Sequence, residues 1–130
     1  MPRPSSKHPT QVELEILQVL WAQGPSTVRQ VHSELSKLRP RAYTSILTLL
    51  SIMARKGYVH VRKTRDGNIY TAKTTQQQTA VGMLRDLVRR AFRGSTVAAV
   101  LSLLDEKELD AEELAYLKKM IDRKTKREAR

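Results

Sequence analysis

The chain has 130 residues, of which 40% are hydrophobic, and this content predicts one domain with a modest core, with or without an appendage. It contains no cysteine, which excludes disulfides, thiolate metal sites and a cysteine nucleophile. No apolar run approaches the roughly 20 residues that span a bilayer, and the first residues lack the apolar core of a signal peptide. We therefore expect a soluble cytoplasmic protein with no membrane partner.

Positive charge is concentrated in the N-terminal part of the chain. The formal net charge is +11, and residues 1–75 hold 12 Lys or Arg against 4 Asp or Glu, whereas residues 76–130 hold 12 against 9. Such an excess on a folded face favours a polyanion, because each neutralised phosphate releases counterions. It also fits a role in solubility or an acidic protein partner, so charge alone leaves these alternatives open.

Two capped helices are predicted after a flexible arm formed by residues 1–9. Thr10 and Glu13 have the spacing of a capping box, so a first helix begins there. Apolar residues cover most of this helix, so little of its surface is left for solvent. They are Val12, Leu14, Ile16, Leu17, Val19, Leu20 and Trp21. Thr27 and Gln30 repeat the capping box and open a second helix. Its buried stripe, which ends before the proline at position 40, is Val28, Val31, Leu35 and Leu38.

A third helix is predicted from about Ala42 to Lys56, and it has two chemically different sides. The apolar side holds Ile46, Leu50, Met53 and Ala54. The opposite side holds Arg41, Thr44, Thr48, Ser51 and Arg55, without any carboxylate. This helix therefore buries one side and offers hydroxyl and guanidinium groups on the other.

A β-hairpin is predicted directly after this helix. Gly57 ends the helix, and Tyr58 to Arg62 form a strand in which two valines, at positions 59 and 61, alternate with polar residues. Arg65 to Asn68 close the hairpin, and Ile69 to Thr74 form its second strand. Three helices followed by a basic hairpin predict a mainly α, winged helix-turn-helix domain over residues 10–75.

Residues 76–130 predict a helical region with a charged tail. Gly94-Ser95 separates two apolar helices, and Asp110 with Glu113 caps a third. A polar tail begins at Asp122 and Arg123, and its last stretch, KTKREAR, is expected to fray. So small a unit buries too little surface to be stable alone, which favours dimerisation over the alternative of packing onto the N-terminal domain. The predicted dimer interface is Val81, Leu84, Val88, Phe92, Val97, Val100, Leu101, Leu104, Leu114, Leu117 and Ile121.

No catalytic constellation is present in the sequence. The three histidines, His8, His32 and His60, have no metal-ligand spacing. The five glycines form no phosphate-binding loop, and Asp66 is expected to form a turn with Gly67. We therefore expect neither an enzyme nor a cofactor.

The sequence resembles the penicillinase-repressor (BlaI/MecI/CopY) family of winged-helix transcriptional repressors. The resemblance covers about residues 10–121 and is carried by ELEILQVLW, STVRQVHSEL, AYTSILTLLSIMARKGYV, the RDGNIY wing and LDAEELAYLKKMID. It implies a homodimer, made by the C-terminal helices, that binds a pseudo-palindromic operator and blocks transcription. The cysteine cluster of copper-responsive members is absent. In the penicillinase branch a protease cuts the dimerisation region, which implies an inactivating protease near Ser102-Leu103, although the local residues differ here.

The third helix is expected to enter the major groove of a double-stranded DNA operator. Base edges or phosphates would be contacted by Thr44, Ser45 and Thr48, and phosphates by Arg41 and Arg55. Tyr43 would donate to a phosphate or pack against the core. Arg62, Lys63 and Arg65 on the wing would meet the adjacent backbone or minor groove, or form a solvated hairpin tip. A nucleoid-type DNA binder with little sequence preference and a winged-helix module that binds protein remain as alternatives.

Overall fold

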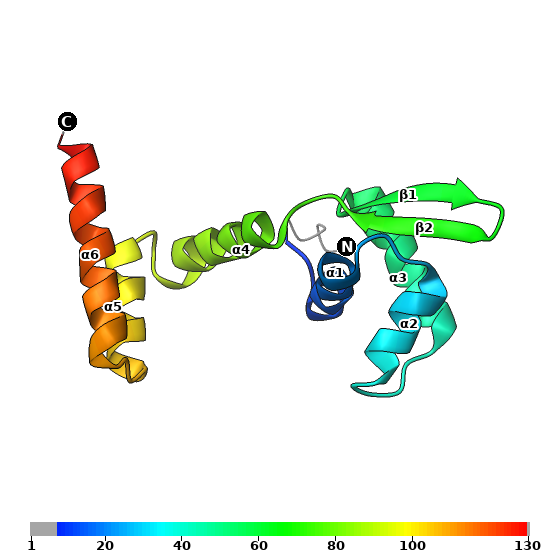
Figure 1. The fold of residues 1–130 in the computed structure, drawn as a ribbon, viewed down its shortest axis with the longest axis horizontal. Helices are drawn as coiled ribbons and strands as arrows, with labels where there is room; N and C mark the ends of the chain where they lie inside the picture. Colours follow the sequence, from blue (N-terminus) through cyan, green and yellow to red (C-terminus); the bar gives the residue numbers. More distant parts are fainter. Residues whose placement is uncertain (1–7, 130) are drawn as a thin grey trace. The chain divides into compact units, whose positions relative to one another are not determined.

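Helices α1, α2 and α3 come first in the chain, followed by one β-hairpin and then by helices α4, α5 and α6 (Figure 1). The computed structural model describes residues 8–129, so most of the predicted N-terminal arm lies outside the described residues. The bounds are α1 Gln11–Gln23, α2 Val28–Ser36, α3 Tyr43–Lys56, β1 Val59–Thr64, β2 Gly67–Ala72, α4 Gln76–Ala91, α5 Thr96–Glu106 and α6 Ala111–Glu128. The predicted fold class is confirmed.

The chain divides into two compact units, Met1–Arg85 and Asp86–Arg130. The first unit contains α1 to α3, the hairpin and the start of α4, and the second contains the rest of α4 with α5 and α6. The division falls inside α4, so this helix is shared between the units.

Reciprocal side-chain caps set the starts of α1, α2 and α6. The Thr10 amide donates to Glu13 Oε1 at 2.8 Å, and the Glu13 amide donates back to the Thr10 hydroxyl at 3.3 Å. Thr27 with Gln30 and Asp110 with Glu113 make the same pair of bonds. All three predicted caps are therefore confirmed.

The core of the first unit lies between α1, α2, α3 and the base of the hairpin. Its buried side chains are Ile16, Leu17, Leu20, Val28, Val31, Leu35, Ile46, Leu50, Met53, Val59 and Tyr70. Trp21 packs against this cluster, as predicted for the chain's only tryptophan, and its Nε1 donates to the Thr74 carbonyl at 2.8 Å. A bridge between Ser26 and Tyr70 joins the start of α2 to the hairpin.

One expectation of burial in this unit is wrong, and one valine of the hairpin is less buried than the other. Leu38 is 76% exposed, because α2 ends at Ser36 and the chain leaves the helical path before this residue. Val61 is 39% exposed, because the hairpin extends past the helices that cover its base (Figure 1). Its partner across the hairpin, Tyr70, is buried instead.

The hairpin turn is tighter than predicted. Thr64 pairs with Gly67, so the turn consists of Arg65 and Asp66 alone. Gly67 has a φ of 115°, a conformation open to glycine but strained for other residues. The Thr64 hydroxyl donates to the Gly67 carbonyl and closes the turn.

The second unit departs from the prediction at its C-terminal end. The last stretch, KTKREAR, is predicted to fray, but α6 continues to Glu128. No glycine or proline interrupts α6. Lys126 and Arg127 in its last turn stabilise the helix, because their positive charges lie at the negative end of the helix dipole. The predicted break at Gly94-Ser95 is confirmed, with Ser95 as the N-cap of α5.

Candidate nucleic-acid interface

The outward side of α3 is a continuous surface without negative charge. Tyr43, Thr44, Ser45, Thr48 and Arg55 are all exposed on this helix, while Ile46, Leu50 and Met53 anchor its other side in the core. The helix contains no acidic residue. Thus all the α3 residues predicted to contact DNA are accessible, and they lie on one helix.

Leu47 also lies on this surface and was missed by the sequence reasoning. It is 39% exposed, and its backbone carbonyl accepts a hydrogen bond from the Ser51 hydroxyl at 3.1 Å. Its position three residues after Thr44 and four before Ser51 was a sufficient signal, because helical periodicity places it beside both. An exposed leucine between hydroxyl side chains can contact a thymine methyl in the major groove.

Arg41 lies in a different environment from the other predicted contacts. Its guanidinium pairs with Glu15 of α1 at 2.7 Å, and only 11% of its side chain is exposed. Glu15 also pairs with Arg39 at 2.9 Å, so one carboxylate holds the two arginines on either side of Pro40. Arg41 therefore already has a carboxylate partner within the protein, which it shares with Arg39.

A side chain of α2 also holds the loop between α2 and α3 in place. His32 Nε2 lies 2.6 Å from the Arg41 carbonyl, and since a carbonyl only accepts, Nε2 carries the proton. The His32 ring meets the Tyr43 ring edge to face, with centroids 5.7 Å apart. Tyr43 is nevertheless 44% exposed, so it both packs and remains accessible.

The far end of α3 is held by a buried ion pair. Lys56 Nζ donates to both carboxylate oxygens of Glu13, at 3.2 and 3.1 Å, and Glu13 is only 1% exposed. The Lys56 ammonium also lies 5.7 Å from the centre of the Tyr58 ring, whose burial raises the pKa of the Tyr58 hydroxyl. Ion pairs to α1 therefore fix α3 at its C-terminal end and just before its N-terminal end.

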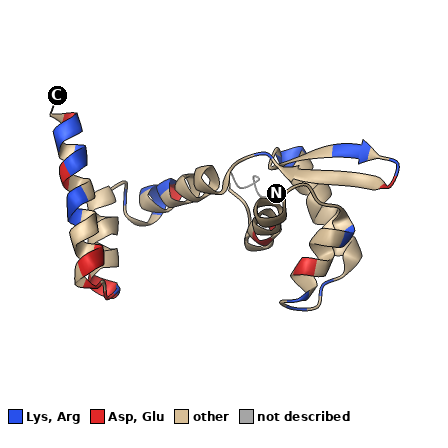
Figure 2. Ribbon diagram, viewed as in Figure 1, with Lys and Arg blue, Asp and Glu red and all other residues tan. Residues whose placement is uncertain are grey.

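The hairpin presents its cations at the end remote from the core (Figure 2). Arg62, Lys63 and Arg65 are all exposed, and Arg62 and Lys63 are adjacent in β1, so their side chains leave opposite faces. Asp66 is the only acid in the hairpin. The wing therefore presents positive charge in more than one direction.

The apolar residues of the C-terminal helices lie largely at the surface. Val97 is 68% and Ile121 is 62% exposed, and Val88 and Phe92 are half-buried. The other predicted interface residues are all exposed: Val81, Leu84, Val100, Leu101, Leu104, Leu114 and Leu117. Ala99 is the only buried hydrophobic residue described in this part of the chain.

The described residues give little support for a metal site or a membrane-spanning helix. Across residues 8–129, no three acidic, histidine or cysteine side chains gather as a metal site would require. In the same range, no helix is both long and apolar enough to cross a bilayer. The Glu34 carboxyl on α2 has its pKa lowered mainly by a hydrogen bond from Lys37, with which it forms an ion pair at 2.7 Å.

Comparison with known proteins identifies the family. The sequence model described as penicillinase repressor matches residues 9–123. The transcriptional regulator BlaI of Mycobacterium tuberculosis is 30% identical over 96 residues, which cover 72% of this chain and 70% of that protein. The penicillinase repressor of Bacillus licheniformis is 24% identical over 110 residues, 85% of this chain and 86% of the relative.

A solved structure is also similar. It is the solution structure of monomeric Bacillus licheniformis BlaI in complex with the blaP half-operator. The two sequences are 26% identical, and the TM-score is 0.44. The match covers 58% of this chain and 87% of the BlaI chain. The resemblance drawn from the sequence motifs is confirmed by the family model and the relatives, and the family consists of transcriptional repressors, not enzymes. The chain belongs to the penicillinase repressor family.

Proposed function

We propose that the protein is a transcriptional repressor that binds a pseudo-palindromic operator as a homodimer. The observation that carries the proposal is the outward side of α3, where hydroxyl groups and Leu47 are exposed without a carboxylate on a helix fixed at both ends. A fixed helix that is free of negative charge suits the major groove, which admits one α-helix. A relative bound to its half-operator supports the same use of the fold.

Within this proposal the exposed residues divide into two groups. Tyr43, Thr44, Ser45, Leu47 and Thr48, in the first half of α3, meet base edges and nearby phosphates. Arg55, Arg62, Lys63 and Arg65 neutralise the backbone or enter the minor groove. Arg41 holds the start of α3 in place, because its carbonyl accepts a hydrogen bond from His32 and its guanidinium donates to the Glu15 carboxylate. Phosphate contacts then position the protein, and base contacts select the sequence.

Residues 10–75 serve as the DNA-binding domain and residues 76–130 as the dimerisation region. The support for dimerisation is the exposed apolar side chains of α4, α5 and α6, which a soluble monomer rarely leaves in contact with water over a large area. Two linked DNA-binding domains engage paired half-sites far more tightly than one domain does.

Inactivation by a protease at Ser102-Leu103 is part of the same proposal. Both residues lie inside α5, and the Ser102 hydroxyl donates to the Ala98 carbonyl at 2.9 Å. Because a protease needs an extended backbone, cleavage here requires α5 to unwind locally. Leu103 is 63% exposed, so the side chain next to the bond is accessible before unwinding.

Selection of bound sequences from a random DNA pool tests the proposal. We expect a symmetric motif with two half-sites, bound roughly 10³-fold or more tightly than random duplex at the same salt concentration. Comparable affinity for every sequence would identify a nucleoid-type binder instead. Absence of any salt-dependent DNA binding would identify a protein-interaction module.

A further inference from the structure

Most of the positive charge of α6 lies on one face, towards the C-terminal end of the helix (Figure 2). A shallow hollow on this face is lined by one alanine, four bases and one acid. They are Ala115, Lys118, Lys119, Asp122, Arg123 and Lys126. At 100° per residue, the six positions cover about 140° of the helix circumference. We call this set the α6 basic face, and its formal charge is +3, from four bases and one acid.

The four bases of this face have no carboxylate partner. Across residues 8–129, no ion pair joins an acid to Lys118, Lys119, Arg123 or Lys126, and Asp122 is unpaired as well. All five side chains are exposed. The charge of the face is therefore directed to solvent and is available to a ligand.

The stability of the helix does not explain this arrangement. Lys119 and Arg123 are like charges four residues apart, as are Arg123 and Arg127, and this spacing destabilises an isolated helix. The helix dipole favours bases only in the last turn, which holds Lys126 and Arg127. Lys118, Lys119 and Arg123 therefore gain no stabilising contact within the described chain.

We propose that the α6 basic face is a second DNA-binding surface, which binds the phosphate backbone of duplex DNA beside the operator, an inference that rests on the proposed function. Duplex DNA carries one negative charge per roughly 1.7 Å of its axis. Lys119 to Lys126 span about 10 Å of α6 at 1.5 Å per residue. Several phosphates can thus be neutralised at once, each with release of counterions. Such contacts add affinity and carry no base readout.

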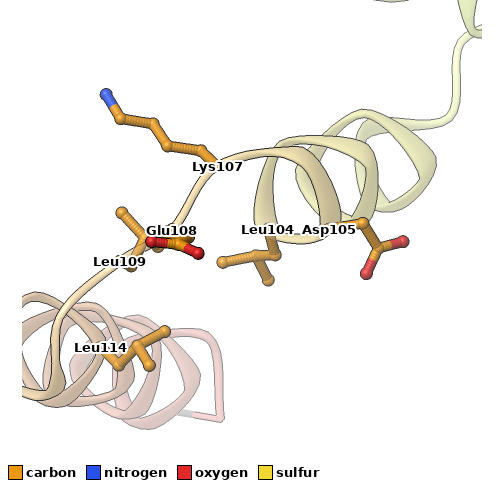
Figure 3. Close-up of a pocket in the computed structure, with 6 residues that line it drawn as sticks. All are labelled: Leu104, Asp105, Lys107, Glu108, Leu109 and Leu114. Carbon is orange, nitrogen blue, oxygen red and sulfur yellow. The ribbon is translucent and has the colours of Figure 1, made fainter.

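The acidic start of α6 confines this surface to the C-terminal part of the helix. The hollow at the α5–α6 turn is lined by Asp105, Lys107 and Glu108 together with three leucines (Figure 3). Glu112 and Glu113 follow in the first turn of α6. This end repels phosphate, so the second unit has one defined region that attracts DNA.

The basic face leaves the proposed dimer contacts free. Leu117 and Ile121 lie roughly 160° and 120° from Ala115 around the helix axis. They are 41% and 62% exposed, and they belong to the apolar side that we assign to the second subunit. One α6 can therefore contribute to the dimer and meet DNA at the same time.

An anionic membrane is the other polyanion that a helix with a basic face can bind. That mode buries the apolar side of the helix among lipid headgroups, so it requires Leu117 and Ile121 to be free. The proposed dimer covers these two residues. The first unit also exposes Arg62 and Lys63, which we assign to a DNA backbone. Both considerations favour DNA.

Titration of random duplex DNA at several salt concentrations, with the full chain, tests the proposal. Each neutralised phosphate contributes about 0.9 to the slope of log affinity against log salt. The triple variant Lys119→Gln, Arg123→Gln, Lys126→Gln should therefore lower the slope by about two to three units. Arg123→Gln alone should lower it by about one unit. Lys124→Gln is the matched control, because this lysine lies on the opposite side of the helix from Ala115 and should leave the slope unchanged.

Three further measurements with the triple variant separate the alternatives. Sedimentation should give the same dimer, and selection from random DNA should give the same operator motif. Loss of the dimer would place these bases in the subunit contact and overturn the inference. An unchanged salt slope would also overturn it and leave the repressor function intact. Loss of binding to phosphatidylcholine–phosphatidylserine vesicles, with the DNA slope unchanged, would assign the face to a membrane instead. Absence of DNA binding by the unmodified protein would refute the proposed function itself.

Discussion

Arg41 and Glu15 form a largely enclosed ion pair, with 2.7 Å between the guanidinium and the carboxylate and with 11% and 13% of the two side chains exposed. The pair joins α1 to the residue that precedes α3. A side chain predicted to neutralise phosphate thus has a partner inside the protein, next to the start of α3.

Glu15→Gln should therefore destabilise the fold and loosen the start of α3. We expect the free energy of unfolding to fall by about 1–3 kcal/mol, because two arginines lose a charged acceptor while the amide keeps one hydrogen bond. Urea unfolding measures this. Arg39→Ala is the control and should cost less than about 1 kcal/mol, because the Arg39 side chain is 58% exposed. Equal costs for the two variants would contradict the assigned role of Arg41.

Leu47→Ala should lower affinity for the selected operator with little change in stability. The side chain is already 39% exposed, so the core loses little when it is shortened. Loss of an apolar contact with a base leaves the number of neutralised phosphates unchanged. The slope of the logarithm of affinity against the logarithm of salt concentration should therefore stay the same. Titration of operator at several salt concentrations separates the two effects, and a changed slope would contradict a base contact.

Thr48→Ala should relax sequence preference at one operator position. The measurement is a repeated selection from random DNA, compared with the unmodified protein. Ser51→Ala is a matched control on the same helix, because the Ser51 hydroxyl already donates to the Leu47 carbonyl. If the Thr48 and Ser51 variants select the same motif as the parent, Thr48 does not read a base.

Lys63→Ala should weaken binding to all DNA sequences alike. Removing one phosphate contact should reduce the salt slope by about one unit. Lys37→Ala removes the same charge at the C-cap of α2, where the ammonium already pairs with Glu34 at 2.7 Å, and should leave the slope unchanged. A loss confined to one operator sequence would contradict a backbone role for Lys63.

A fragment that ends at Arg85 should be monomeric and bind the operator weakly. It retains the first compact unit, including the bond from Trp21 to Thr74, and lacks α5 and α6. Two half-sites then no longer act together, so affinity should approach that of a single half-site. Sedimentation and operator titration test this, and a dimeric fragment would place the interface elsewhere.

Local features of the fold were predictable from the sequence, because each depends on residues a few positions apart. The three capping boxes and the apolar side of α3 are of this kind. Leu38 was predicted wrongly because burial depends on where the chain leaves the core, which periodicity does not encode.

The ion pairs that hold α3 are the part of the candidate site that the sequence did not predict. Glu15 and Arg41 are 26 residues apart, and Glu13 and Lys56 are 43 apart, so only the folded chain brings them together. The choice of α3 and the wing as the DNA-binding surface follows from fold order and charge, and the individual contacts stay predictions.

The hydrogen bond from Trp21 to the Thr74 carbonyl has a practical consequence. Because the chain has a single tryptophan, its tryptophan fluorescence comes from one known place, the contact between α1 and the residues that follow β2. Any event that pulls these residues away from α1 would change the polarity around the indole and shift its emission. The protein thus contains its own optical probe for movement of the residues after β2 relative to α1.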